Sequence, residues 1–309
     1  MSKLYLITGF LGAGKTTFLK NFIRLFEGKR MHIIVNEYGK EGIDGQLLKE
    51  LGTVLDEINN GSIFCSCRLD KFEEVLQKAL SAAPDVIIIE ASGLSNPTNV
   101  RKIMAQEEKF PGLEYMGSIC LLDAKRFHKV YQTATVVKKQ IGISDIILIN
   151  KTDLAAPEEL EQIRRTIREH RPDIPVYETC FGEIQDTWLE EMKKPPLASE
   201  KPEIQTKDIT LRSYILKISE TFTVYELEKF VEMFLEDTYR VKGFVRLENR
   251  TWYLDCVGNL FSIKPYEKEI HGENEIVVLA GNGLPAAKSI KEAIKWYPGK
   301  VESFAPAGK

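Results

Sequence analysis

The sequence predicts an α/β domain with a doubly wound, mostly parallel sheet, followed by a smaller α+β domain with a mainly antiparallel sheet. In the first two thirds of the 309 residues, short apolar runs alternate with amphipathic stretches, as buried parallel strands and their connecting helices do. Later, short runs of alternating polarity follow one another, which is typical of antiparallel strands. Three prolines and several charges in Lys193–Pro202 indicate a linker. We therefore expect domains over residues 1–192 and 207–309, joined by a linker over residues 193–206.

The alternation in the first domain predicts six strands and four helices. Each expected strand is a continuous apolar run of the kind that is buried on both faces of a parallel sheet. The expected strands are Leu4–Thr8, Met31–Asn36, Asp85–Glu90, Ser118–Asp123, Asp145–Asn150 and Ile174–Tyr177. The expected helices are Lys15–Phe26, Lys71–Ala82, Asn96–Gln106 and Pro157–His170, the last with proline at its start.

The pattern of the second domain predicts five strands and two helices. The first helix has a threonine in the position that an N-terminal capping residue would occupy. The expected strands are Ile209–Ile218, Val241–Leu247, Thr251–Val257, Leu260–Ile263 and Glu275–Leu279. The expected helices are Thr223–Leu235, with Thr223 as its cap, and Lys288–Trp296.

The composition excludes several classes of protein. A net charge of −3 and a pI near 6.0 give no basic surplus for a nucleic acid or an anionic membrane. The longest apolar runs are strand-sized, whereas a membrane-spanning helix needs about 20 apolar residues. Five cysteines are an odd number, and only Cys65 and Cys67 lie close together in sequence. With no apolar leader at the start, we expect a reduced, cytoplasmic protein.

Gly9–Thr16 matches the phosphate-binding pattern G-x-x-x-x-G-K-[ST] between an apolar run and a helical stretch, which is the context this motif requires. Glycines let backbone N–H groups curl around phosphates, and the helix N-terminus presents the positive end of its dipole. We expect Lys15 to reach the β- and γ-phosphates and the Thr16 hydroxyl to bind Mg²⁺. The candidate nucleotide-binding residues of the loop are Gly9, Gly12, Ala13, Gly14, Lys15, Thr16 and Thr17.

Two further motifs stand at the ends of expected strands. Asn150-Lys151-Thr152-Asp153 fits the guanine-reading pattern N-K-x-D, in which the Asp153 carboxylate accepts from two guanine donors that adenine lacks. Glu90 ends the most apolar strand, where a Mg²⁺ ligand belongs, and the Gly93 N–H is expected near the γ-phosphate. The candidate catalytic residues are Lys15, Thr16, Glu90 and Gly93, and Thr16 and Glu90 are the candidate Mg²⁺ ligands. The candidate base-binding residues are Asn150, Lys151 and Asp153.

Together these motifs resemble those of the CobW-like P-loop metallochaperone GTPases, which are related to HypB and UreG. Thr8–Thr17 reads T-G-F-L-G-A-G-K-T-T, and Val35–Gly39 reads V-N-E-Y-G where the family has V-N-E-F-G. The E-x-x-G-L and N-K-x-D motifs match at Glu90–Leu94 and Asn150–Asp153, and Arg240–Phe244 resembles the family's R-x-K-G-x. The resemblance covers nearly the whole chain and implies a P-loop GTPase domain followed by a small α+β domain.

The sequence departs from the family at the metal signature C-x-C-C. Ser62 and Phe64 replace the first two cysteines, Cys65 aligns with the third, and Cys67 is an additional one. Thiolates are ligands for Zn²⁺ or Co²⁺, so Cys65 and Cys67, with Glu37 from the V-N-E-Y-G segment, are candidate transition-metal ligands. The alternative is that both cysteines are small residues in a packed turn.

The resemblance implies a protein that hydrolyses GTP to GDP and phosphate. It further implies coupling of the nucleotide state to transition-metal delivery or to cobalamin or metalloenzyme cofactor assembly. Its expected partner is a client metalloprotein or a cofactor-assembly enzyme, and dimerisation of the chain is one expected way to stimulate slow turnover. Two alternatives remain: a nucleotide-gated interaction module without metal binding, and a small-molecule P-loop kinase, in which the N-K-x-D motif would have no role.

Overall fold

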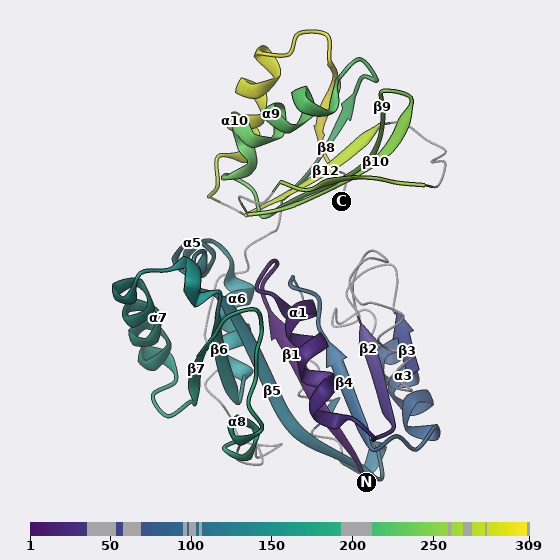
Figure 1. Ribbon diagram of the computed structural model, residues 1–309, viewed down its shortest axis with the longest axis vertical. Coiled ribbons are helices and arrows are strands. Elements are labelled where there is room, and N and C mark those ends of the chain that lie inside the picture. The colour runs from purple at the N-terminus through teal and green to yellow at the C-terminus, as the bar shows by residue number, and fades with distance from the viewer. Residues whose placement is uncertain are drawn as a thin grey trace. The chain divides into compact units, whose positions relative to one another are not determined.

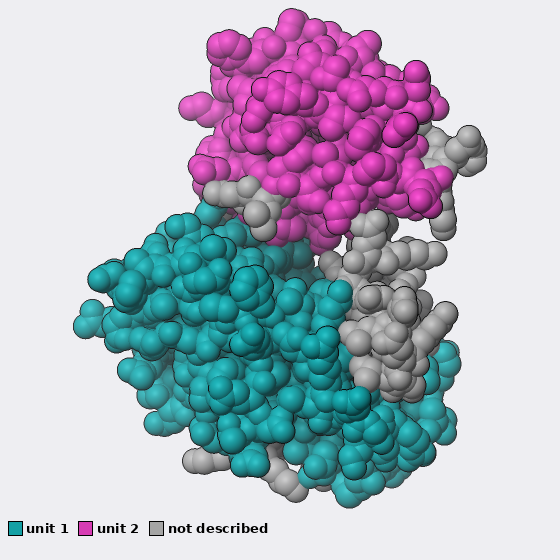
Figure 2. All heavy atoms as spheres, viewed as in Figure 1, with its two compact units in different colours: residues 1–206 teal, residues 207–309 magenta. Residues whose placement is uncertain are grey.

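The computed structural model describes residues 1–35, 54–57, 69–94, 98, 103–104, 107–192, 212–258, 261–267, 274–281 and 283–307. The chain divides into two compact units, residues 1–206 and 207–309, which Figure 2 distinguishes by colour. Among the helices of these described ranges, none is both long enough and apolar enough to cross a membrane.

The first unit contains a seven-stranded sheet in the order β3-β2-β4-β1-β5-β6-β7, and every pair of neighbours is parallel (Figure 1). The strands are β1 (Ser2–Gly9), β2 (Met31–Val35), β3 (Val54–Glu57), β4 (Val86–Glu90), β5 (Leu113–Asp123), β6 (Ile146–Asn150) and β7 (Val176–Thr179). The α-helices are α1 (Lys15–Phe22), α3 (Leu69–Ser81), α5 (Phe127–Thr133), α6 (Thr135–Ile143), α7 (Pro157–His170) and α8 (Asp186–Glu190). Because β4 leads to β5 on the far side of β1, the sheet is doubly wound, as predicted.

Both faces of this sheet are buried, as strand β1 illustrates. Leu4 and Leu6 face the cluster formed with α3, and Tyr5 and Ile7 face the cluster formed with α1, because successive strand side chains point to opposite faces. The helices contribute Phe72, Leu76 and Ala79 from α3, and Phe18, Leu19 and Phe22 from α1. Burial of each large apolar side chain contributes roughly 1.5–3 kcal/mol, so these two layers hold the strand ends in place.

The structure corrects several predicted boundaries in this unit. The α-helix expected over Lys15–Phe26 ends at Phe22, and Ile23–Phe26 form a 3-10 helix instead. Strand β5 begins at Leu113 instead of Ser118, because its first half pairs with β1 through a bulge that interrupts the apolar pattern. Strand β7 ends at Thr179, two residues later than expected. Of the helix predicted over Asn96–Gln106, the described residues 98, 103 and 104 are helical.

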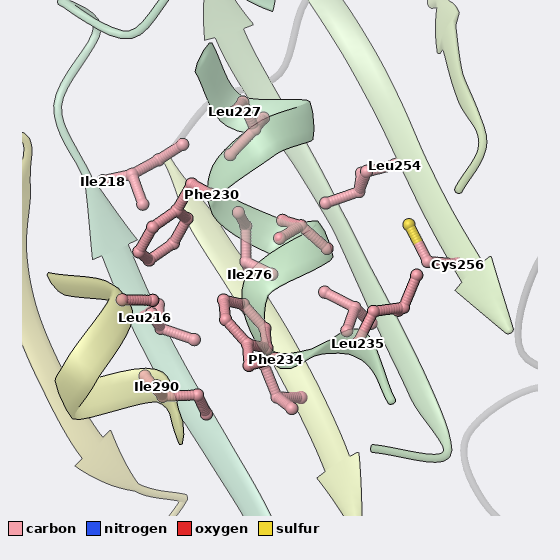
Figure 3. Close-up of a cluster of buried hydrophobic side chains, with 14 of the residues drawn as sticks. Leu216, Ile218, Leu227, Phe230, Phe234, Leu235, Leu254, Cys256, Ile276 and Ile290 are labelled. Carbon is pink, nitrogen blue, oxygen red and sulfur yellow. The ribbon is translucent and has the colours of Figure 1, made fainter. Parts of the chain in front are cut away.

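The second unit contains a six-stranded antiparallel sheet in the order β11-β10-β9-β12-β8-β13, and its described residues also form two helices. Its elements are β8 (Arg212–Ile218), α9 (Val224–Leu235), β9 (Arg240–Leu247), β10 (Arg250–Val257), β11 (Ile263–Pro265), β12 (Glu275–Ala280), α10 (Ala286–Lys295) and β13 (Val301–Pro306). In Figure 3, Phe230 and Phe234 of α9 pack with Ile276 of β12 and Leu216 of β8 in the core.

Thr223 caps α9 as predicted: its hydroxyl accepts from the Glu226 N–H at 3.1 Å, and the Glu226 carboxylate accepts from the Thr223 N–H at 2.9 Å. Three predictions here need correction. The last helix begins two residues earlier, at Ala286. The strand predicted over Leu260–Ile263 lies at Ile263–Pro265, where pairing with β10 sets its bounds. Strand β13 was not predicted, because its side chains are partly or fully exposed and show no apolar alternation.

Candidate functional site

The predicted nucleotide-binding residues converge at one edge of the first sheet. Because neighbouring strands are parallel, their carboxyl ends meet, and open α/β sheets bind ligands at that edge. In the strand register, Glu90 lies opposite Ile7 and Asn150 lies opposite Asp123. Gly9, at the end of β1, lies opposite Leu121. The phosphate loop that follows β1 is therefore flanked by Glu90 on one side and by the residues that end β5 and β6 on the other.

The phosphate loop adopts a backbone conformation that its glycines make accessible. Gly9, Gly12 and Gly14 have φ values of 141°, 77° and 93°, a region in which residues with a Cβ are strained. At Gly9 an added Cβ would lie 2.4 Å from the Leu121 carbonyl oxygen, so the loop leaves β1 in direct contact with β5. Gly14 forms the N-cap of α1, and that helix has no acidic residue in its first turn. These features suit the loop to bind phosphate.

Lys15 places its positive charge within the curve of this loop. Its side chain is buried, and the ammonium donates to the carbonyl oxygens of Gly9 at 3.0 Å and Phe10 at 3.1 Å. These bonds hold the long side chain in place over the loop. A phosphate in the loop would meet this ammonium as well as the N–H groups of the helix start.

Thr16 and Glu90 come together as the sequence predicts. The Thr16 hydroxyl donates to the Glu90 carboxylate at 3.3 Å, although the two residues are 74 positions apart in sequence. Glu90 is buried, with 3% of its surface exposed. A hydroxyl and a carboxylate are both hard oxygen donors, the type that Mg²⁺ prefers. The residues present therefore fit a Mg²⁺ ion beside the phosphate loop.

Gly93 lies against the phosphate loop. A Cβ added to Gly93 would fall 2.6 Å from the Leu11 main-chain nitrogen and 2.9 Å from its Cα. Only a glycine allows this approach without a shift of one of the two backbones. The segment that carries Gly93 is thus in contact with the loop that would hold the phosphates, and the position of its N–H near a γ-phosphate stays a prediction.

Asn150 joins three segments of the site. Its amide nitrogen donates to the Ala13 carbonyl at 2.9 Å, and its amide oxygen accepts from the Gly182 N–H at 3.1 Å. An added Cβ on Gly14 would lie 2.4 Å from that nitrogen, so the side chain passes directly over the phosphate loop. Asn150 therefore ties β6 to the phosphate loop and to the loop after β7. The role of Gly182 was not predicted, since nothing in a short loop sequence indicates this contact.

Lys151 and Asp153 occupy the turn after β6. Lys151 has a φ of 63°, and its ammonium donates to the Asp123 carboxylate at 2.7 Å. Asp153 is exposed within the 3-10 turn Thr152–Leu154, where its carboxylate is open to a ligand. Asp123 is a further candidate site residue that no sequence motif indicates, although it ends an apolar strand with a carboxylate just as Glu90 does.

The proposed transition-metal ligands Glu37, Cys65 and Cys67 lie outside the described residues, so their assignment stays a prediction. Within the described ranges, no group of three or more His, Cys, Asp or Glu side chains is arranged to hold a metal ion. Burial raises the pKa of the Cys120 and Cys256 thiols to about 12 each. Since a thiolate is the form that ligates metal, these two buried thiols are poor metal ligands near neutral pH.

Both units of this chain match known protein families. A family model described as "CobW/HypB/UreG, nucleotide-binding domain" matches residues 3–178, and one described as "Cobalamin synthesis protein cobW C-terminal domain" matches residues 211–295. The zinc chaperone YjiA of Escherichia coli is 28% identical over 261 residues, which are 79% of this chain and 81% of YjiA. The zinc chaperone CobW of a Sinorhizobium species is 31% identical over 209 residues, 58% of this chain and 59% of that protein.

A third relative, the zinc-regulated GTPase metalloprotein activator 1 of Schizosaccharomyces pombe, is 28% identical over 191 residues, which are 59% of this chain and 46% of that protein. The first family model alone spans more than half of this chain and contains the phosphate loop, Glu90 and the Asn150–Asp153 motif. The match agrees with the predicted resemblance and with the geometry at the carboxyl edge of the sheet. The chain belongs to the CobW/HypB/UreG family of P-loop GTPases.

Proposed function

We propose that this protein binds and hydrolyses GTP and couples its nucleotide state to the delivery of a transition-metal ion, with Zn²⁺ as the first candidate. The observation that carries the GTPase part is the convergence of the phosphate loop, the Thr16–Glu90 pair and the Asn150–Asp153 turn at one sheet edge. Family membership supports the same activity. The names of the zinc chaperones YjiA and CobW support Zn²⁺ as the cargo.

In this proposal the residues act mainly by positioning and by neutralising charge, as is usual in phosphoryl transfer. The Lys15 ammonium leaves its two carbonyl partners and meets the β- and γ-phosphate oxygens. Thr16 and Glu90 would hold the Mg²⁺ ion, which when bound neutralises phosphate charge. Asp153 accepts from the two guanine donors. Asn150 holds the Thr152–Leu154 turn at a fixed position relative to the phosphate loop. The Gly93 N–H meets the γ-phosphate.

The metal part of the proposal rests on Glu37, Cys65 and Cys67. With two cysteines where the family signature has three, we expect a labile site, as transfer to a client metalloprotein requires. The departures at Ser62 and Phe64 favour one other candidate, a nucleotide-gated interaction module that no longer binds metal. In both versions residues 1–192 form the GTPase domain, and residues 207–309 are the candidate surface for a client or a second copy.

The GTPase part is tested by measuring phosphate release from GTP and from ATP with the full-length protein, Lys15→Ala and Lys20→Ala. Lys20 is the next lysine along α1 and serves as a matched control. We expect turnover of GTP in preference to ATP, a loss of at least roughly 100-fold in Lys15→Ala, and little change in Lys20→Ala. Equal turnover of ATP and GTP, or an active Lys15→Ala variant, would contradict the proposal. Phosphate release that requires an added acceptor would instead indicate a kinase.

A further inference from the structure

A buried glutamine contacts the segment that carries Gly93. Gln140 lies in α6 with no exposed surface, and its amide nitrogen donates to the Gly93 carbonyl at 3.2 Å. The two residues are 47 positions apart in sequence, so the bond connects two otherwise separate segments. A primary amide is costly to bury unless it is hydrogen-bonded, so a fully buried glutamine on this helix calls for a partner such as this one.

The helix that carries Gln140 provides a firm anchor. Six of its nine residues, including Val137 and Ile141, are buried. Its C-terminal end is fastened by side chains: the Ser144 hydroxyl donates to the Gln140 carbonyl at 2.6 Å, and the Arg171 guanidinium donates to the Gly142 carbonyl. A side chain projecting from such a helix holds its partner more rigidly than one on a loop would.

Gly93 is consequently held at two points. On one side it abuts the Leu11 backbone of the phosphate loop, and on the other its carbonyl is bound by the Gln140 amide. Glycine has the greatest backbone freedom of any residue, so an unanchored Gly93 would sample many orientations. The bond to Gln140 fixes the peptide that follows Gly93 and thereby limits the conformations available to the glycine. Ordering a binding segment in advance raises affinity by reducing the entropy lost on binding.

We propose that Gln140 is a positioning residue for the γ-phosphate: by fixing Gly93 it sets how strongly the protein prefers a nucleoside triphosphate to a diphosphate. This inference rests on the proposed function, in which the Gly93 N–H meets the γ-phosphate. A diphosphate has no group at that position, so its binding is independent of Gln140. The Gln140 amide also links the nucleotide site to α6. A movement of Gly93 on gain or loss of the γ-phosphate would therefore be transmitted through this hydrogen bond to the helix.

The test compares full-length wild type, Gln140→Met and Ser144→Ala. Methionine matches the length of glutamine but has no donor, whereas Ser144→Ala removes a buried hydrogen bond from the same helix without touching Gly93. The ligands are GDP and guanosine 5′-(β,γ-imido)triphosphate, both with Mg²⁺, and the readouts are the two Kd values and the thermal midpoint. Gln140→Leu provides a second donor-free variant in case methionine disturbs folding.

In Gln140→Met we expect the Kd for the triphosphate analogue to rise by about threefold to tenfold, the range that one lost neutral hydrogen bond produces. The Kd for GDP should stay within about twofold in every variant. Ser144→Ala should lower the thermal midpoint but leave the ratio of the two Kd values as in wild type. An unchanged ratio in Gln140→Met, or an equal shift in Ser144→Ala, would overturn the role of Gln140 while the GTPase proposal stands. A wild type that binds neither nucleotide would overturn both.

Discussion

In the proposed function, Asp153 is the residue whose chemistry would separate guanine from adenine most directly. It is exposed on the Thr152–Leu154 turn, while the neighbouring Lys151 ammonium is engaged by Asp123. A carboxylate in this position can accept from both the ring N–H and the exocyclic amine of guanine. Adenine offers no such pair of donors and would leave the carboxylate without a partner.

Replacement of Asp153 by Asn should therefore weaken GTP binding by on the order of 100-fold, because the carboxylate charge is lost and one of its two acceptor oxygens becomes an NH2 donor that faces the guanine amine. The same variant should bind xanthosine triphosphate better than the wild type does, since xanthine has an acceptor where guanine has the amine. Equilibrium titration with both nucleotides measures the change. Asp173→Asn, at an exposed position between α7 and β7, is the matched control and should behave as wild type. Unaltered GTP affinity in Asp153→Asn would remove the guanine assignment.

Single motifs in the sequence predicted Lys15, Thr16, Glu90 and the Asn150–Asp153 turn as site residues, because each pattern is short and local. The contacts that connect them could not be predicted in the same way. The bonds from Asn150 to Ala13 and Gly182, and from Lys151 to Asp123, join residues 28 to 137 positions apart. Such pairs depend on strand order, which hydrophobic patterning does not determine.

At the scale of elements, prediction succeeded where the pattern was long and bounded by clear signals. Helix α7 runs over Pro157–His170 as expected, because proline marks its start and its apolar residues recur at helical spacing. Strand β3 was missed, since its four residues include two carboxylates. Helices α5 and α6 were missed because Ala134 divides one helical pattern into two short ones.

Helix α9 carries an electrostatic contact that makes its stability depend on pH. The Glu226 carboxylate closes the capping box with Thr223 and also pairs with the Lys300 ammonium just before β13. The hydrogen bond from Lys300, followed by that from the Thr223 backbone, lowers the pKa of Glu226 from its ordinary value of 4.5 to about 2. Because the folded pKa is depressed, this contact stabilises the protein fully above pH 4.5. The stabilisation is lost as the pH falls from about 4.5 to about 2.

Glu226→Gln should accordingly lower the thermal midpoint of the protein at neutral pH. The gap between variant and wild type should close as the pH falls toward 2, because the wild-type carboxyl then takes up its proton. Thermal unfolding followed by circular dichroism over this range measures the gap. Glu228→Gln removes a carboxylate from the same helix. Its difference in thermal midpoint from the wild type should not close as the pH falls toward 2. If the difference in thermal midpoint between Glu226→Gln and wild type stays constant with pH, the proposed stabilisation by the ionised Glu226 carboxylate is wrong.

At the scale of the whole molecule, the candidate nucleotide-binding residues lie within the first unit, and the candidate metal ligands belong to the same part of the chain. Glu37 follows the end of β2 by two residues, and β2 pairs with β4, which ends at Glu90. Cys65 and Cys67 lie between β3 and α3 in sequence. If metal and nucleotide influence each other, linkage requires that each change the affinity for the other by the same factor.

The most direct test of the account is a Zn²⁺ titration of the reduced full-length protein in two states, loaded with GDP or with a non-hydrolysable GTP analogue. We expect the two Zn²⁺ affinities to differ by about fivefold or more, the usual size of coupling between sites. Binding should release protons, because the thiols must ionise to ligate. A Cys65→Ser, Cys67→Ser double variant should lose both the tighter binding and the difference. Identical weak Zn²⁺ binding by the wild type and the double variant in both nucleotide states would contradict nucleotide-coupled metal delivery. The nucleotide-gated interaction module would then be the remaining proposal.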